Sequence, residues 1–120
     1  MSRRAAIDLR AKILRALADP VRLELLEYLS DGEKCTCQIL PAFSRSQSTI
    51  SKHMNILHDA GILERRIDGR RTLYRIRDER VLDILREVDF LARSQIEDLA
   101  EVGQFLEAEW APSSPTEKVA

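Results

Sequence analysis

The fold is decided by residues 44–58, which read Ser-Arg-Ser-Gln-Ser-Thr-Ile-Ser-Lys-His-Met-Asn-Ile-Leu-His. Ser46 is a favourable helix start, because its hydroxyl can accept a hydrogen bond from a backbone N–H of the first turn. Ile50, Met54 and Leu57 then follow at helical spacing and form an apolar stripe that can dock on a core. The opposite face is polar and basic, which is typical of a helix that enters a DNA major groove.

The polar face of this helix supplies the first candidate contacts. Short side-chain donors and acceptors can read base edges, and basic side chains can bind phosphates. We therefore predict groove contacts from six residues and a phosphate contact from Arg45; the six are Gln47, Ser48, Thr49, Ser51, Lys52 and His53.

Two helical patterns open the chain. Residues 5–17 carry apolar residues at helical spacing and predict a first helix. Asp19 followed by Pro20 is a favourable N-cap and first helical position, so a second helix is expected to begin there. The turn signal at residues 30–32, Ser-Asp-Gly, ends it.

A third, shorter helix is expected over residues 33–43, which contain a Cys-x-Cys pair. Pro41 should end or bend this helix, because proline disfavours helical backbone in the residue before it. A turn then leads into the Ser46-capped helix, so residues 33–58 read as a helix-turn-helix pair.

A basic hairpin follows the pair. Gly61 is suited to the left-handed position that ends a helix. Strands are expected over residues 62–67 and 70–76, joined by Asp68-Gly69, a strong hairpin signal. Four arginines gather around this turn and can reach phosphates or a narrow minor groove; they are Arg65, Arg66, Arg70 and Arg71. A helix-turn-helix followed by a basic hairpin is a winged helix, so we expect a mainly α fold with one small β-hairpin.

The last expected helix runs over residues 79–110 and carries apolar residues at 4-3 spacing through about four heptads. So long a stripe exceeds what a small core can cover, and we predict a helix–helix homodimer. The expected interface residues are Leu9, Ile13, Val81, Leu85, Val88, Ala92, Leu99, Val102 and Leu106. Residues 1–111 would form one DNA-binding and dimerisation domain, with a disordered tail over residues 112–120.

Charge is distributed unevenly along the 120 residues. The net charge is −1, yet residues 41–77 hold eight Lys/Arg against three Asp/Glu, and residues 78–120 hold four against eleven. A basic middle section indicates a local anionic partner such as double-stranded DNA. There is no apolar run of about 18 residues and no secretory signal, so we expect no membrane contact and a cytoplasmic protein.

Several blocks of sequence resemble the ArsR/SmtB family of metal-responsive repressors. The similarity includes Leu17-Ala-Asp-Pro-Val-Arg-Leu-Glu-Leu-Leu26, the Gly32-Glu-Lys-Cys-Thr-Cys-Gln-Ile39 segment, residues 46–53 and the hairpin. The middle segment is similar to the family's metal box, and the match covers about residues 7–77. The resemblance implies a winged-helix homodimer of five helices and a hairpin that represses its operator until a ligand binds.

Cys35 and Cys37 are the candidate metal ligands. Thiolates suit As(III) and Sb(III), which we favour, and also Cd(II), Pb(II) or Zn(II), far better than Mg²⁺ or Ca²⁺. Positions i and i+2 of an ideal helix point about 200° apart, so chelation by both would require local distortion. In the arsenic-responsive branch a third cysteine follows three places after the second, where this chain has Leu40. Water, a small thiol or Glu33 could supply the third ligand.

Three alternatives remain open. The cysteines could sense oxidants or reactive sulfur, although a Cys-x-Cys disulfide closes a cramped ring. The chain could be a constitutive regulator without an inducer, or a protein-interaction module. No nucleophile–base set, phosphate loop or His-Glu-x-x-His motif is present, so the sequence does not predict an enzyme.

Overall fold

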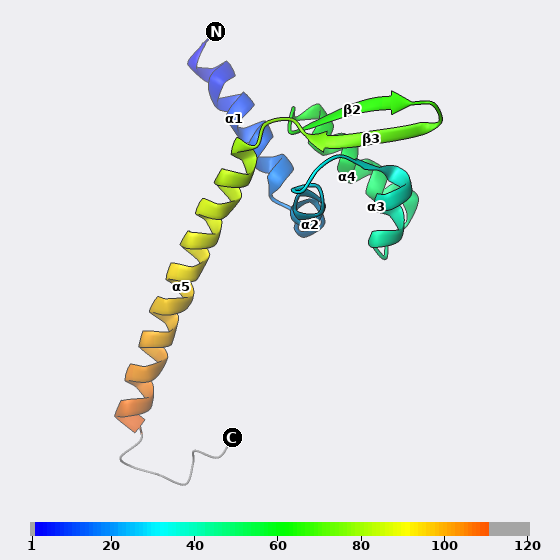
Figure 1. The fold of residues 1–120 in the computed structure, drawn as a ribbon. Coiled ribbons are helices and arrows are strands. Elements are labelled where there is room, and N and C mark those ends of the chain that lie inside the picture. The colour runs from blue at the N-terminus through cyan, green and yellow to red at the C-terminus, as the bar shows by residue number, and fades with distance from the viewer. Residues whose placement is uncertain (1, 111–120) are drawn as a thin grey trace. The chain divides into compact units, whose positions relative to one another are not determined.

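The computed structural model describes the backbone of residues 2–110 and the side chains of residues 2–107. Figure 1 shows a winged helix-turn-helix, as predicted. Its helices are α1 (Arg3–Leu17), α2 (Pro20–Tyr28), α3 (Thr36–Ala42), α4 (Gln47–Asp59) and α5 (Arg80–Trp110). Its strands are β1 (Lys34–Cys35), β2 (Leu63–Asp68) and β3 (Arg71–Ile76). The predicted tail, residues 112–120, lies outside the described residues.

The helix starts follow from their caps. The carboxylate of Asp19 accepts hydrogen bonds from the backbone N–H groups of Val21 and Arg22, and Pro20 opens α2. The hydroxyl of Ser46 accepts from the backbone N–H of Thr49 at the start of α4. Each cap satisfies donors that have no partner within the helix, so both predicted starts are confirmed.

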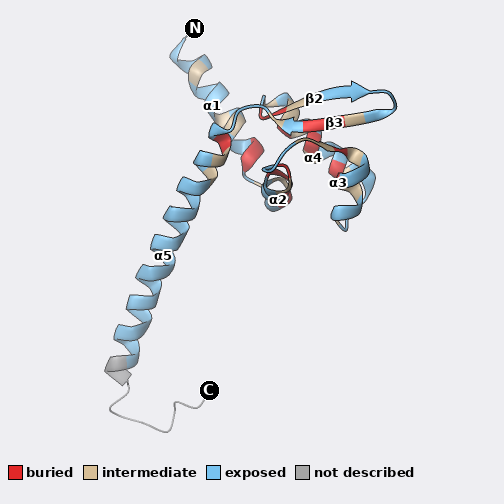
Figure 2. Ribbon diagram, in the orientation of Figure 1, coloured by how far each residue is buried: buried red, intermediate tan, exposed pale blue. Residues whose placement is uncertain are grey.

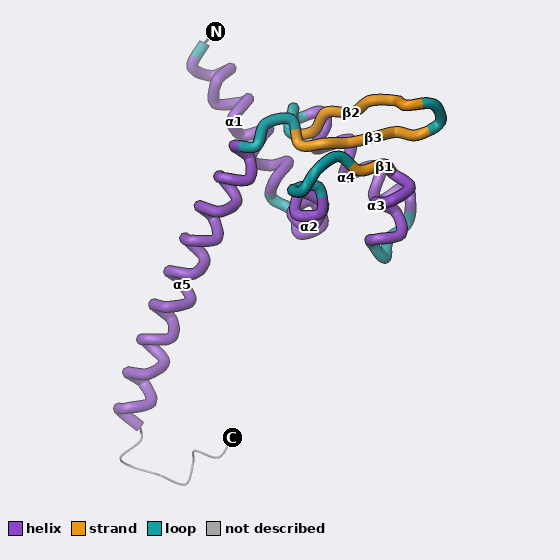
Figure 3. The backbone as a smooth tube through the Cα atoms, in the orientation of Figure 1, coloured by secondary structure: helices purple, strands orange, loops and turns teal. Residues whose placement is uncertain are grey.

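The sheet contains one strand that the sequence patterns did not predict. β1 pairs antiparallel with β3, with Cys35 opposite Leu73, and the strand order is β1-β3-β2 (Figure 3). The predicted helix over residues 33–43 is therefore wrong at its start, since α3 begins only at Thr36. Two residues are too short to show an alternating pattern, and pairing with β3 decides their conformation.

The turn of the hairpin also differs by one residue from the prediction. Asp68 pairs with Arg71, so the two-residue loop is Gly69-Arg70 rather than Asp68-Gly69. Gly69 has φ = +63°, whereas no non-glycine residue of the described chain has positive φ. A single positive φ at the first loop position fits a type II′ turn, in which glycine occupies that position.

The chain divides into two compact units, with the boundary between Leu82 and Asp83. The core of the first unit lies between the helices and the sheet (Figure 2) and is built from apolar side chains alone among the described residues. Its most deeply buried members include Leu25, Leu26, Leu29, Ile39, Ile50, Met54 and Leu57. The three α4 residues predicted to dock on a core are thus buried, which leaves the other face of α4 outside.

Apolar residues are widely exposed along α5. Of the predicted interface set, Leu9, Val88, Ala92, Leu99, Val102 and Leu106 are exposed and Ile13 and Leu85 are half-buried. Val81 instead is buried within its own chain. Further apolar residues, among them Phe90, Leu91, Ile96 and Phe105, are also exposed. Within the part of the chain that the structure describes, no helix is both long and apolar enough to span a bilayer.

Candidate nucleic-acid interface and dithiol site

The outer face of α4 presents most of the predicted groove residues. Gln47, Ser48, Ser51 and Lys52 are exposed, and Thr49 is half-buried. The hydroxyl of Ser46 lies 2.9 Å from the hydroxyl of Thr49 and 3.2 Å from that of Ser48. These hydroxyls are therefore ordered by the helix cap before any ligand arrives. Arg45, in the turn before α4, is exposed as well.

His53 is placed differently from the prediction that it contacts DNA. Its side chain is only 16% exposed, and its Nδ1 lies 3.0 Å from the Nη1 of Arg22 and 4.0 Å from the carboxylate of Asp19. Because arginine has no acceptor, Arg22 donates and the Nδ1 of His53 accepts. The ring is thus engaged with α2, and we leave it out of the proposed DNA contacts.

Arg22 connects three helices. Besides His53, its guanidinium donates to the backbone carbonyls of Ala16 and Arg15, at 2.6 Å and 3.1 Å. Burial raises the pKa of Asp19, but hydrogen bonds from the backbone N–H groups of Arg22 and Val21 outweigh it and leave the pKa below its usual value. Sequence spacing gives no sign of this network, because 31 residues separate Arg22 from His53.

The four hairpin arginines are all exposed, but their surroundings differ. Arg65 donates to the side-chain oxygen of Asn55 on α4 at 3.4 Å. Arg71 forms an ion pair with Asp68 across the turn, at 3.2 Å. Arg70 lies in the loop itself, at the tip of the hairpin.

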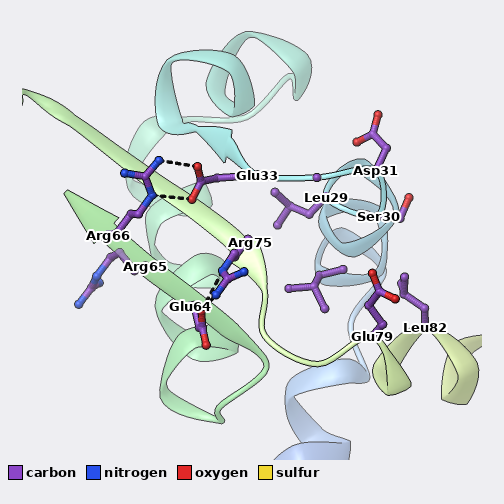
Figure 4. A pocket seen from close by; sticks show the side chains of 12 residues that line it. Leu29, Ser30, Asp31, Glu33, Glu64, Arg65, Arg66, Arg75, Glu79 and Leu82 are labelled. Carbon is purple, nitrogen blue, oxygen red and sulfur yellow. Dashed lines mark hydrogen bonds and ion pairs between the residues drawn. The ribbon is translucent and has the colours of Figure 1, made fainter. Parts of the chain in front are cut away.

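Arg66 forms a two-pronged ion pair with Glu33. Its Nε and Nη2 donate to the two carboxylate oxygens at 2.9 Å and 2.8 Å (Figure 4). The hydrogen bonds from Arg66 hold the pKa of Glu33 below its usual value, and Glu33 raises the pKa of Arg66. On the same hairpin, the Nε of Arg75 donates to the carboxylate of Glu64 at 2.8 Å.

Both ion pairs border a surface cleft of about 580 Å³ between the hairpin and the turn after α2. Its apolar floor is formed by Leu29, Ile76 and Leu82. The Glu33–Arg66 pair bridges the turn and the hairpin, whereas the Glu64–Arg75 pair lies on the hairpin alone, and within each pair the two charges cancel.

The two cysteines lie side by side at the start of α3. Cys35 has extended backbone angles (φ −86°, ψ 161°) and precedes the helix, whereas Cys37 lies inside it. Their Cα atoms are 5.1 Å apart and their sulfurs form a disulfide. The expected separation of about 200° does not apply, because only one of the pair is helical. Cys35 is buried at 1% exposure, and Cys37 is exposed.

The donor set fits a thiophilic ion in part. Two sulfurs that can meet are suited to As(III) or a soft metal once they are reduced to thiolates. The carboxylate of Glu33, considered above as a third ligand, is occupied by Arg66. Among the described residues no group of three or more His, Cys, Asp or Glu is arranged to hold a metal ion. Of the third ligands considered from the sequence, water and a small thiol remain candidates.

Comparison with known proteins places these features in context. Residues 19–65 match the family model described as bacterial regulatory protein, arsR family. An uncharacterised HTH-type transcriptional regulator of Methanocaldococcus jannaschii is 43% identical over 82 residues, which cover 68% of this chain and 92% of that protein. An arsenical resistance operon repressor of Staphylococcus xylosus is 39% identical over 82 residues, covering 68% and 79%.

A solved structure agrees with the sequence relatives. The homodimeric winged helix-turn-helix DNA-binding domain from Mycobacterium bovis, described as a possible ArsR-family transcriptional regulator, superposes with a TM-score of 0.71 at 32% identity. The match covers 82% of this chain and 93% of that one. The relatives and the fold are those of DNA-binding regulators and not of enzymes.

Proposed function

The chain belongs to the ArsR/SmtB family of winged helix-turn-helix transcriptional repressors, and we propose that it represses its operator as a homodimer until a thiophilic ion binds Cys35 and Cys37. As(III) or Sb(III) is the favoured inducer. The observation that carries the DNA half is the exposed polar face of α4 beside the basic hairpin β2–β3. The observation that carries the inducer half is the meeting of the two sulfurs at the start of α3.

DNA binding would use two kinds of contact. Gln47, Ser48, Thr49, Ser51 and Lys52 of α4 would read base edges in the major groove, where hydrogen bonds distinguish all four base pairs. Arg45 and the hairpin arginines would hold phosphates and set the register of the protein on the duplex.

Dimerisation would place two copies of α4 on one operator. The exposed apolar side chains of α5 and α1, such as Leu99 (69% exposed) and Leu9 (50%), lack cover in the single chain. A second copy of the same chain supplies matching apolar surface, and a relative of this fold is homodimeric. The two recognition helices would then enter half-sites about one helical turn apart.

Binding of the inducer would act on the segment directly before α4. The ion needs both cysteines as thiolates, and a thiolate at buried Cys35 requires a compensating positive charge, which the ion provides. Relief of repression requires a coupling of only about 1–3 kcal/mol between the dithiol and the DNA surface.

A second candidate is a dithiol redox switch, favoured by the disulfide between Cys35 and Cys37. Here hydrogen peroxide would accept two electrons from the two thiols; the sulfurs would form the disulfide, and the peroxide oxygens would leave with the thiol protons as two water molecules. The operator surface and the dimer would be the same, and only the chemical signal would differ.

The test is fluorescence anisotropy on the promoter of the adjacent operon with reduced protein. We titrate As(III), Sb(III), Cd(II), Pb(II), Zn(II) and hydrogen peroxide in separate experiments. As(III) should release the DNA from the wild-type chain, whereas the double variant Cys35→Ser, Cys37→Ser should bind DNA but not respond. Release by peroxide alone selects the redox switch, and release of the double variant by As(III) excludes the cysteine site.

A further inference from the structure

Arg66 is the one hairpin arginine tied directly to the segment that carries the dithiol. Its partner Glu33 stands two residues before Cys35, and both carboxylate oxygens accept from the guanidinium. The strands that carry Cys35 and Arg66 lie on either side of β3. Cys35 of β1 lies opposite Leu73, and Arg66 of β2 lies opposite the same residue.

From this geometry we propose that Glu33 competes with DNA phosphate for Arg66, and that this competition carries a change at the dithiol to the hairpin. The inference rests on the proposed function for its DNA and inducer, and adds a positioning residue that the DNA surface itself does not contain.

The competition follows from the geometry of the pair. Two parallel N–H···O bonds between a guanidinium and a carboxylate use the same fork that would hold a phosphate. Arg66 is 58% exposed and Glu33 28% exposed, so solvent and DNA can reach the arginine from one side while the carboxylate holds it from the other. While it is paired the two charges cancel, and Arg66 contributes little to counterion release on binding DNA.

The connection to the dithiol follows from chain distance. Only Lys34 separates Glu33 from Cys35, and Lys34 is fixed in β1 opposite Tyr74. An ion held by Cys35 and Cys37 would take the place of the direct bond between their sulfurs. Because Cys35 belongs to β1, this exchange would shift the short strand and change the reach of the Glu33 carboxylate. A tighter hold on Arg66 would weaken the contact of the hairpin with DNA.

The first experiment compares Glu33→Gln with Glu64→Gln. Both variants remove one negative charge from the same cleft, but Glu64 pairs with Arg75, which is outside the predicted DNA contacts. Binding to the operator and to a random-sequence duplex is measured by anisotropy from 0.1 to 1 M salt. Freeing Arg66 should add one phosphate contact and steepen the slope of log K against log salt by about 0.9. If the curves of the variant and the wild-type chain meet at 1 M salt, Glu33→Gln should bind about eightfold more tightly at 0.1 M.

The second experiment tests the connection to the dithiol. The ratio of operator affinities without and with As(III) should be at least a few-fold smaller for Glu33→Gln than for the wild-type chain and for Glu64→Gln. The gain of Glu33→Gln should also vanish when Arg66→Ala is added.

Each contrary result has one meaning. Equal salt slopes for the two glutamine variants, or a gain that survives Arg66→Ala, would overturn the competition. An unchanged As(III) ratio in Glu33→Gln would overturn the connection to the dithiol. If the wild-type chain prefers the operator no more than the random duplex, the proposed function is wrong, but the slopes on the random duplex still decide the competition.

Discussion

The guanidinium of Arg22, in the first turn of α2, donates a hydrogen bond of 3.0 Å to the Nδ1 of His53 in the middle of α4. The same guanidinium binds the carbonyls that end α1. One side chain therefore links α4 to α1 and α2. His53 acts in this structure as a support for α4, whereas its neighbour Lys52 is exposed and free to face DNA.

His53 and Lys52 are expected to separate stability from DNA binding. His53→Ala removes the acceptor of Arg22 and should lower the free energy of unfolding by about 1–2 kcal/mol, with an unchanged salt slope of DNA binding. Lys52→Ala should leave stability unchanged but make the slope shallower by about one unit. Thermal unfolding and anisotropy provide the two measurements; a shallower slope for a folded His53→Ala would restore the histidine to the DNA surface.

Arg70 at the tip of the hairpin is expected to matter more for DNA binding than Arg71. Arg71 already pairs with Asp68, so its removal also frees a carboxylate, whereas Arg70 lies in the loop. Arg70→Ala should weaken binding and reduce the salt slope by about one unit. An unchanged slope in Arg70→Ala would remove the tip from the contact surface.

The loop can be tested separately with Gly69→Ala, which should destabilise the hairpin because φ is +63° there.

The parts of the fold that local sequence controls were predictable. Asp19, Pro20 and Ser46 define helix starts through hydrogen bonds within the first turn, and a glycine with positive φ marks the hairpin. The two-residue strand β1 was not predictable, because its conformation depends on pairing with β3, about 40 residues away. The hairpin loop was displaced by one residue, since Asp68 pairs with Arg71 and so belongs to the strands.

The candidate site shows the same division. Residue type and helical spacing predicted the outer face of α4: Gln47, Ser48, Ser51 and Lys52 are exposed, whereas Thr49 and His53 are half-buried. The partners of Arg22 and Arg66 depend on contacts across 31 and 33 residues, which no spacing rule contains. The sequence left open whether the two sulfurs meet, either on an ion after local distortion or in a disulfide, because their meeting depends on β1, which was not predictable.

The two cysteines should differ in reactivity and in their effect on stability. In the reduced protein, exposed Cys37 should be alkylated by iodoacetamide before buried Cys35, because access limits the second thiol. Cys35→Ser puts a hydroxyl into an apolar core position and should cost about 1–3 kcal/mol, whereas Cys37→Ser should cost little. Mass spectrometry of the labelled peptides and denaturant unfolding test the two statements; labelling of Cys35 first would contradict the burial.

Asp78 is expected to make the start of α5 sensitive to acid. Hydrogen bonds from the side chain and the backbone N–H of Arg80 lower its pKa from 3.8 to about 2. Because the pKa of Asp78 is lower in the folded chain than in the unfolded chain, its ionised carboxylate stabilises the fold at pH values above about 4. That contribution is lost as the pH falls from about 4 towards 2. The ¹³C shift of the Asp78 carboxyl should titrate near pH 2, and Asp78→Asn should abolish that part of the pH dependence. A midpoint near 3.8 would show that the pair with Arg80 does not persist in solution.

Dimerisation should depend on the apolar stripe of α5 rather than on its charged face. Leu99 and Val102 are 69% and 54% exposed in the single chain, and Leu99→Glu with Val102→Glu would place two charges in the proposed seam. Burying an unpaired charge costs several kcal/mol, so the variant should sediment as a monomer at micromolar concentration. The matched control is Glu97→Gln with Glu101→Gln, two exposed residues on the same stretch, which should remain dimeric.

The glutamate variant should also bind DNA more weakly. Because a monomer holds only one half-site, its operator affinity should fall about 100-fold or more. A glutamate variant that stays dimeric and binds normally would place the interface elsewhere on the chain.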